Sequence, residues 1–379
     1  VADMDLASDS IRQSVNRAQE VSGEVIDWAY VGITGASISS QSGRSMVAVG
    51  RRPRMVKHED VSRGLATARD IDLPSGEKLL HLIPSRYTLD GQSGVIDPVG
   101  MRGFRLDVDS HQVTLPTNVT DNLIKSTQKA GLKVRGFVLQ SLACAYAALH
   151  PDEMNAGVVI ADIGAGTTGI AAFKDNSVVL TSVLPIGGSS ITQDLAIGLG
   201  LPFDLVETLK KQHADVSVRT INSNGSDGSE EEDQENRYIS ISYEGLSTIY
   251  KQDFNDIVKA RVEEILKLIV SQLPASHAYV AAFPTGLVLT GGTANIPGIA
   301  SMAQEVTGLP CRVATPSGLT GLDDPLYNPA YLSAVGLLLC KGRPGQDQSW
   351  ARDSMLTRAA GIMKNAKSLV PRVKIYRGF

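Results

Sequence analysis

The chain has 379 residues, of which 42% are hydrophobic and 20% charged, and its formal net charge is −4. That length allows two or more domains with buried cores, and the weakly acidic balance excludes the basic signature of a nucleic-acid-binding protein. The three cysteines, Cys144, Cys311 and Cys340, fit neither a disulfide framework nor a metal-ligand spacing, which favours a cytosolic compartment. Because the sequence has no run of 18 apolar residues and no signal-peptide pattern, we expect neither a membrane span nor a leader.

The first forty residues predict a helix followed by a strand. Apolar residues recur at helical spacing over 11–21, and 28–35 is a short apolar run that ends at Gly35. Residues 43–115 have a different texture, which begins with the apolar run 46–49. Here we predict a polar helix over 59–70 and two short strands over 78–84 and 103–108.

Residues 117–150 are predicted to be helical, with Thr120 or Asp121 as the N-cap. From residue 157 the pattern changes to strands separated by glycine turns, followed by helices. A short echo links the two halves of the chain, since Val31-Gly-Ile-Thr-Gly35 is similar to Val288-Leu-Thr-Gly-Gly292. The echo favours a duplicated architecture with a ligand between the halves.

The strongest motif lies over 158–173, where two apolar runs flank a turn rich in glycine and threonine. This pattern predicts a β-hairpin, whose glycines let backbone N–H groups approach an anion. Asp162, at the end of the first run, could hold a metal-bound water near phosphates. The alternative is a plain hairpin with a structural aspartate. The candidate phosphate-binding residues of this turn are Gly164, Ala165, Gly166, Thr167 and Thr168.

Two further motifs add to the first. Residues 287–298 predict a buried strand, a glycine turn at Gly291-Gly292-Thr293 and a helix, and paired glycines at a strand end allow close approach of a flat ligand. Gly187-Gly188 opens another predicted helix, and Glu207 and Lys210 follow on one helix face. Each has a simpler reading, as a helix-start loop or as an exposed charged pair.

In this order the motifs resemble the actin-like ATPases, and among them the FtsA family of bacterial cell-division proteins. The resemblance runs over about residues 1–343 and recurs at the tail. Its most specific part lies in 81–105, within the subdomain that this family inserts, and consists of His81, Pro84, Tyr87, Asp90, Asp97, Gly100, Gly103 and Arg105.

The resemblance implies an α/β, actin-like (ribonuclease H-like) two-domain ATPase fold that binds ATP and Mg²⁺. By matching position, Asp162 and residues 164–168 form the second phosphate-binding hairpin, with Asp162 holding magnesium through water. Gly187 and Gly188 flank the phosphates, Glu207 and Lys210 border the adenosine, and residues 291–293 line the base and ribose. Residues 140–147 form the connecting helix at the domain hinge.

Two departures from the family pattern bear on catalysis. Residues 1–40 contain no Asp-x-Gly-Thr first phosphate loop, and the initial residue is not Met, so we expect the chain to start within a longer protein. Gly169 stands where an acidic residue often follows the second hairpin. We therefore expect ATP binding with at most slow hydrolysis, and we name no catalytic residue.

The resemblance also implies partners. The predicted helix over 253–272 matches the helix that receives the C-terminal tail of FtsZ, with Arg261 and Glu264 at the contacting positions; the alternative is an ordinary surface helix. Residues 223–236 contain no apolar side chain and are predicted to be a solvated loop. Self-association into filaments, and binding of other division proteins through residues 43–115, are further implied.

The C-terminal region predicts a membrane anchor. Residues 343–351 have linker composition, and 352–370 form an amphipathic helical pattern with basic borders, typical of interfacial helices on anionic lipids. The alternative is a helix that packs on the protein's own core. The membrane-contacting candidates are Met355, Leu356, Arg358, Ile362, Met363, Lys364, Lys367 and Leu369.

The resulting expectation is a peripheral protein that tethers FtsZ filaments to the cytoplasmic face of the inner membrane at the division septum and helps assemble the divisome. Two alternatives stay open, an actin-like pilus-assembly adaptor and a sugar or acetate kinase. The expected layout is a first actin-like domain (1–42 and 116–155), the inserted subdomain (43–115), a second domain (156–205 and 281–342) with a smaller subdomain (206–280), a linker (343–351) and a tail (352–379).

Overall fold

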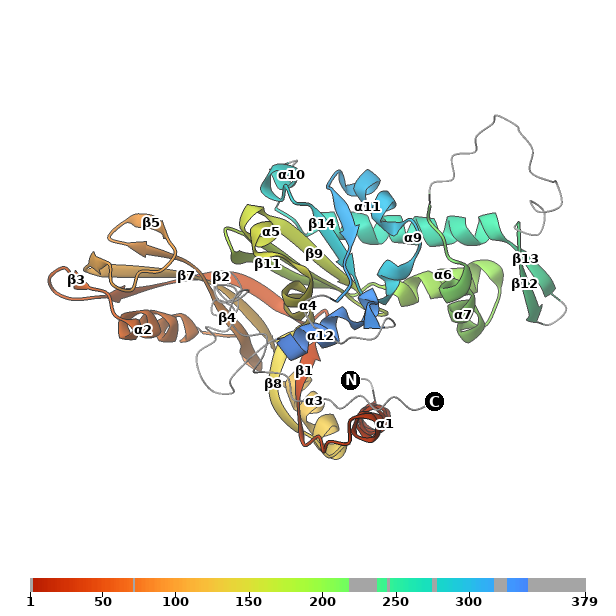
Figure 1. The fold of residues 1–379 in the computed structure, drawn as a ribbon, viewed down its shortest axis with the longest axis horizontal. Coiled ribbons are helices and arrows are strands. Elements are labelled where there is room, and N and C mark those ends of the chain that lie inside the picture. The colour runs from red at the N-terminus through yellow and green to blue at the C-terminus, as the bar shows by residue number, and fades with distance from the viewer. Residues whose placement is uncertain are drawn as a thin grey trace.

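The computed structural model describes residues 3–70, 72–217, 237–243, 246–274, 278–316 and 326–339. The expected acidic loop, linker and C-terminal tail lie outside these ranges. The elements form an elongated molecule, with the four-stranded sheet that contains β5 and β7 at one end of its long axis and the hairpin β12–β13 at the other (Figure 1). None of the helices within the described residues combines the length and apolarity that crossing a bilayer requires.

The largest sheet has five strands in the order β11-β10-β9-β14-β15. Strand β9 pairs antiparallel with β10 and parallel with β14. Its sequence, VVIADI, is almost wholly apolar because helices cover both faces of this sheet. The strands span Ser177–Leu184 (β11), Thr168–Lys174 (β10), Val158–Ile163 (β9), Leu287–Thr290 (β14) and Cys311–Val313 (β15).

Of the helices that accompany this sheet within the described residues, the longest is α9 (Lys251–Ser271). Its buried residues recur at helical spacing from Phe254 through Val258, Val262 and Ile265 to Ile269, so one face packs on α6 and α11. The hairpin β12 (Tyr238–Tyr243) and β13 (Leu246–Tyr250) leads into it. The other helices beside the sheet include α5 (Pro151–Ala156), α6 (Gly188–Leu199), α7 (Phe203–His213), α10 (Ala278–Ala282) and α11 (Ile299–Thr307).

A second, smaller α/β unit is built on two parallel strands, β1 (Trp28–Ile33) and β8 (Lys133–Leu139). The predicted first helix and strand are confirmed, as α1 (Met4–Ser22) and β1. The prediction of continuous helix over 117–150 is wrong, because β8 separates α3 (Thr117–Lys129) from α4 (Gln140–Ala148). The capping prediction is also wrong: Pro116 is the N-cap of α3, and Thr120 Oγ1 bonds back to Thr117 O within its first turn.

Residues 39–116 form a separate antiparallel sheet, in the order β2-β7-β4-β5, with α2 (His58–Arg69) packed against it. The predicted polar helix is confirmed, and the run at 78–84 lies within a much longer strand. The run at 103–108 is instead divided at residue 104 between the end of one strand and the start of another. The strands of the sheet are β2 (Ser39–Ala48), β7 (Arg105–Pro116), β4 (Glu77–Leu89) and β5 (Gln92–Val95); β3 (Arg54–Met55) and β6 (Arg102–Gly103) form a small ribbon beside them.

One apolar core joins all three units. It takes residues from β4 and β7, from α4 and from the five-stranded sheet, and α4 is buried from Ser141 to Ala147. Helix α12 (Leu332–Leu339) crosses α4 at Gly336, where a Cβ would lie 2.0 Å from Ala143 O. Two buried histidines also lie in this region: His81 Nε2 accepts from Leu139 N (3.0 Å), and His111 pairs with Thr181 Oγ1 (2.8 Å).

Candidate functional site

The predicted hairpin is present, with a tight turn between β9 and β10. Gly164 N donates to Thr167 O (2.9 Å), which closes the turn. Thr168 Oγ1 donates to Ile186 O (2.8 Å) and so fixes the hairpin to the segment before α6. Thr168 is therefore buried and structural, whereas Gly166 lies at the tip, where an added Cβ would meet no atom within 4 Å.

The glycine pair at the start of α6 packs directly on this turn. Gly188 N donates to Gly164 O (2.9 Å) and Ser189 N donates to Ala165 O (2.7 Å). A Cβ at Gly187 would lie 2.6 Å from Gly164 O, so only glycine allows this approach. No hydrogen bond among the described residues uses the amides of Ala165 and Gly166. These two N–H groups are thus the donors that the turn can offer to an anion.

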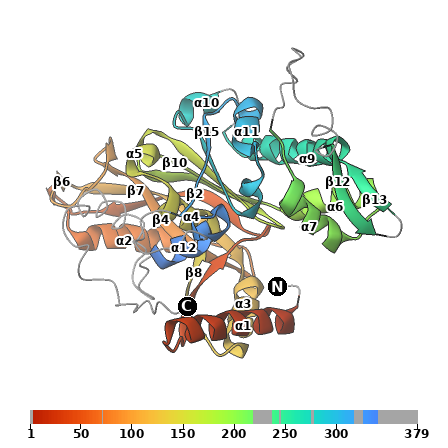
Figure 2. The same ribbon diagram turned by 45° about the vertical axis from the view of Figure 1, so that its right-hand side comes forward.

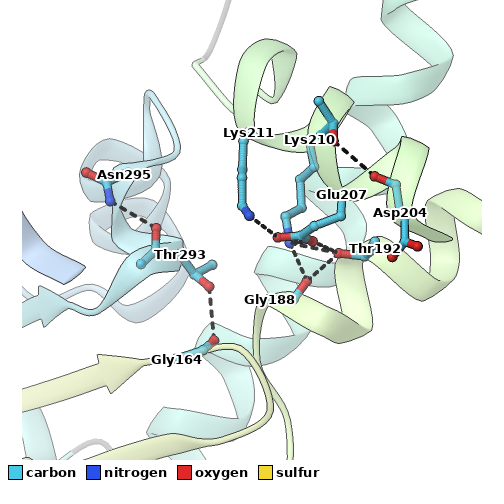
Figure 3. Close-up of polar contacts among 11 residues, drawn as sticks. Gly164, Gly188, Thr192, Asp204, Glu207, Lys210, Lys211, Thr293 and Asn295 are labelled. Carbon is cyan, nitrogen blue, oxygen red and sulfur yellow. Dashed lines mark hydrogen bonds and ion pairs between the residues drawn. The ribbon is translucent and has the colours of Figure 1, made fainter. Parts of the chain in front are cut away.

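The third glycine turn meets the same carbonyl. Thr293 Oγ1, at the start of the 3₁₀ turn η1 (Gly292–Asn295), donates to Gly164 O (3.1 Å). The turn is held by Asn295 Nδ2, which donates to Gly292 O (3.1 Å), as Figure 3 shows. Gly291 has φ of 87°, a conformation that favours glycine.

Glu207 and Lys210 form one network with the start of α6 (Figure 3). Lys210 Nζ donates to Gly188 O (2.9 Å), to Thr192 Oγ1 (2.7 Å) and to Glu207 Oε2 (2.6 Å). Lys211 Nζ pairs with the other oxygen of Glu207 at 3.1 Å. Desolvation raises the pKa of Glu207, but the hydrogen bonds from Lys210, Thr192 and Lys211 outweigh it, and the pKa lies below its usual value. Glu207 is therefore a carboxylate at neutral pH.

Asp162 lies beside the third glycine turn. It pairs with Thr290 across β9 and β14, and a Cβ at Gly291 would lie 2.6 Å from Asp162 Oδ1. Burial raises the pKa of this carboxyl, which accepts a weak hydrogen bond from Cys144 Sγ at 3.5 Å. A cation held nearby would favour the ionised form. The described residues contain no cluster of three or more His, Cys, Asp or Glu that could hold a metal, so a magnesium site at Asp162 depends on water and stays a prediction.

Thr34 is a site residue that the sequence motifs do not identify. Thr34, just after β1, has its Oγ1 3.3 Å from Thr167 Oγ1 at the hairpin turn. It brings the smaller α/β unit into contact with the candidate phosphate-binding turn. The Thr-Gly echo at 34–35 is the sequence signal for this contact, although by itself it indicates only a duplicated architecture with a ligand between the halves.

Arg261 and Glu264 are adjacent on α9 and take no part in the glycine-rich site. Arg261 donates to Asp194 on α6 through Nε (2.5 Å) and Nη2 (2.8 Å), and through Nη1 to Glu264 (2.6 Å). The hydrogen bonds to Asp194 raise the pKa of Arg261. The guanidinium therefore ties α9 to α6, while Glu264 is half exposed. The membrane-contacting candidates, from Met355 to Leu369, lie outside the described residues.

Comparison with known proteins gives the same family for two parts of the chain. Residues 159–336 match the family model of cell division protein FtsA, and residues 35–114 match the model of the SHS2 domain inserted in FtsA. The chain is 33% identical to cell division protein FtsA of Pseudomonas aeruginosa over 339 residues, covering 89% of this chain and 78% of that protein. It is 34% identical to cell division protein FtsA of Bacillus subtilis over 340 residues, covering 89% and 73%.

Among solved structures, a chain of the PilM-PilN type IV pilus biogenesis complex aligns with a TM-score of 0.56, covering 87% of this chain and 84% of that one. At 14% identity, this likeness shows the fold alone. The expected fold class is confirmed: an actin-like two-domain α/β fold with an inserted subdomain of the FtsA type.

Proposed function

Because the chain belongs to the FtsA family of cell division proteins, we propose that it binds ATP with Mg²⁺ and couples filaments of FtsZ to the cytoplasmic face of the cell membrane at the division septum. In this role the nucleotide sets the conformation in which copies of the chain associate. The protein acts as a peripheral adaptor for the assembly of other division proteins, and it hydrolyses ATP slowly at most.

The observation that carries nucleotide binding is the convergence of two further glycine turns on the hairpin turn, at the carbonyl of Gly164. A Cβ at Gly187 would lie 2.6 Å from this carbonyl oxygen, and a Cβ at Gly188 would lie 2.6 Å from Thr293 Oγ1, which donates to the same oxygen. Within the described residues, the amides of Ala165 and Gly166 take part in no hydrogen bond, and they lie beside the hydroxyl of Thr167. Backbone N–H groups in such a turn suit phosphate oxygens.

The other residues of the site fit a nucleotide in defined roles. Ala165, Gly166 and Thr167 would hold phosphate oxygens. Glu207 and Lys210 would border the adenosine, held in position by their bonds to Thr192 and Gly188. Residues 291–293 would line the base and ribose, because Gly292 has no neighbour within 4 Å of an added Cβ. ATP would supply the charged phosphates, and Asp162 would orient a water on their magnesium ion.

Slow hydrolysis is supported by the hairpin itself. Gly169 lies directly opposite Asp162 in the β9–β10 register, so no side chain stands at the position where related proteins carry an acid. An added Cβ there would be in ordinary contact with Ser141, at 3.4 Å. The site therefore has backbone donors for binding but lacks a general base at this position.

The membrane and FtsZ roles rest on membership of the family and on sequence patterns. The amphipathic pattern over 352–370 supports attachment to anionic lipids. The exposed side of α9 around Glu264 supports binding of the FtsZ tail. The pilus-assembly alternative has no more than a shared fold behind it, and the match of residues 35–114 to the domain inserted in FtsA favours cell division. No observation favours a sugar or acetate kinase.

Substitution at Gly166 tests the nucleotide site. A side chain there meets no protein atom within 4 Å, so Gly166→Leu should leave the melting temperature unchanged while it fills the space that phosphates need. Titration with a fluorescent ATP analogue and Mg²⁺ should show at least a tenfold loss of affinity, against none for Ser10→Leu on the exposed side of α1. Equal affinity in Gly166→Leu and the unmodified chain would remove the hairpin from the site.

A further inference from the structure

The inserted subdomain carries a polar hollow that the proposed function does not use. It has a volume of about 350 Å³ and lies on the four-stranded sheet, between residues of β2, β4, β7 and the β4–β5 hairpin. Three arginines and two aspartates line it: Arg44, Arg86, Arg105, Asp107 and Asp109. Ser93 and Gly94 of β5 line the hollow. Figure 1 shows β5 at the end of the molecule away from α6, where the glycine-rich site begins, and in Figure 2 β7 and α6 again lie on opposite sides.

The two aspartates hold the arginines in place. Asp107 is only 7% exposed and accepts from Arg44 Nη2 (3.1 Å) and Arg105 Nε (2.8 Å), while Asp109 pairs with Arg44 Nε at 3.4 Å. Desolvation raises the pKa of Asp107, but Arg105 and Arg44 outweigh it and the pKa lies below its usual value. The guanidiniums are therefore positioned before any ligand arrives.

Each arginine keeps unused donors. Arg86 pairs through Nη2 with Asp175 in the turn between β10 and β11. Within the described residues, the Nη1 groups of Arg44, Arg86 and Arg105 take part in no hydrogen bond. Three unused guanidinium edges around one hollow suit carboxylates, which accept bidentate hydrogen bonds from arginine.

The chain itself contains a matching ligand. Six of the nine residues over 227–235 are acidic: Asp227, Glu230, Glu231, Glu232, Asp233 and Glu235. The segment is joined to Tyr238 of β12, and Figure 1 shows β12 and β13 at the end of the molecule opposite to β5. This placement favours a contact between two copies. A contact between two different surfaces repeats along a row of copies, because each copy offers both halves.

We propose that the hollow around Arg44, Arg86 and Arg105 binds the acidic segment 227–235 of a second copy of the chain. The inference rests on the self-association proposed above and assigns one contact in it. The contact is ionic at an exposed surface, so it weakens with salt and gains strength from repetition along a filament.

A peptide of residues 223–237 with a fluorescent label tests the contact by anisotropy. The protein in this assay carries Glu230→Gln, Glu231→Gln and Glu232→Gln, so that its own segment competes less. Binding should weaken as salt rises and fall at least fivefold with Arg86→Gln, whose partner Asp175 is exposed and tolerates the loss. Arg44→Lys should retain part of the affinity for the peptide. Arg312→Gln, which breaks an exposed ion pair with Glu153 elsewhere, should change nothing.

Light scattering with ATP and Mg²⁺ separates this contact from self-association itself. If Arg86→Gln and Arg44→Gln bind the peptide as well as the unmodified protein does, the proposed contact is wrong. If these variants also still assemble, the proposed function is not contradicted. If the peptide binds but no condition yields assembly, the proposed self-association fails instead. Glu232→Arg should impair assembly, and the reciprocal Arg86→Glu in the same chain should restore part of it if the contact exists.

Discussion

Lys210 Nζ lies 2.9 Å from the backbone oxygen of Gly188, the first residue of α6. Through this bond a side chain of α7 holds the glycine that packs on the turn of the hairpin, and the same ammonium pairs with Glu207 and Thr192. The network is part of the site's framework, so a change at Lys210 reaches the turn through the main chain.

Lys210→Met should destabilise the fold and weaken nucleotide binding. The change leaves the oxygens of Gly188, Thr192 and Glu207 without their shared donor, and loss of a partly buried, charged hydrogen bond costs about 1–3 kcal/mol. Urea unfolding and titration of an ATP analogue measure the two effects. Lys211→Met is the matched control, because the Lys211 side chain is 71% exposed and should cost under about 0.5 kcal/mol. Equal effects of the two variants would contradict the role of the network.

Stability should fall as the pH drops below 6.5. Burial lowers the pKa of His81 to about 3 and that of His111 to about 4. Between pH 6.5 and these folded-state pKa values, the two histidines are therefore protonated in the unfolded chain but neutral in the folded chain. Each histidine should cost about 1.4 kcal/mol per pH unit well below pH 6.5, a loss that ends once the pH passes the folded-state pKa.

Urea unfolding at pH 7 and pH 5 in His111→Gln and in the unmodified chain checks this slope, which should be shallower in the variant. The hydrogen bond from Arg54 lowers the pKa of Asp60, although desolvation opposes it. Asp60 therefore changes the stability only below about pH 4 and does not contribute between pH 7 and pH 5. His213, with a pKa lowered by burial and by Lys251, contributes equally to both proteins. Parallel slopes would show that His111 is not a cause of the loss.

Binding of the FtsZ tail should depend on α9. Arg261→Glu should abolish it, but this change also places a carboxylate beside Asp194 and disturbs the tie to α6. Glu264→Lys is the sharper variant, because Glu264 is 51% exposed and pairs with Arg261 alone among the described contacts. Titration with a peptide of the FtsZ C-terminal tail should show reduced affinity for both. Lys267→Gln, which breaks an ion pair with Glu263 on the same helix, serves as control; unaltered affinity in all three would leave α9 without this role.

The C-terminal residues should hold the protein on membranes. A version ending at Gly342 should stay in the supernatant when it is sedimented with anionic liposomes. Ile362→Glu should lose nearly as much of its binding to the liposomes. Each basic residue near an anionic surface contributes about 1 kcal/mol, which salt weakens, and apolar burial adds on the order of 1 kcal/mol for each large side chain. Raised salt should thus release only part of the protein. Pelleting of the shortened protein would place the anchor elsewhere.

The sequence by itself determined the hairpin, the three glycine turns and the helix predicted over 253–272, which is α9 (Lys251–Ser271) in the structure. These are local features: Gly164–Thr167 lies between two apolar runs, and the buried face of α9 follows a period that any window of the sequence reveals. The order of the motifs also gave the family. Even the pairing of Glu207 with Lys210 followed from their spacing on one helix.

Only the tertiary structure decided which of these residues meet. Strand β8 was hidden because its partner β1 lies about a hundred residues away, and without that partner KVRGFVL between two helices has no clear period. The contact of Thr34 with Thr167, and the use of the Gly188 and Ser189 amides by the hairpin, likewise join segments that are distant in the chain. Spacing along a sequence specifies local geometry, whereas the partner of a strand end or of a free N–H is chosen when separate elements pack together.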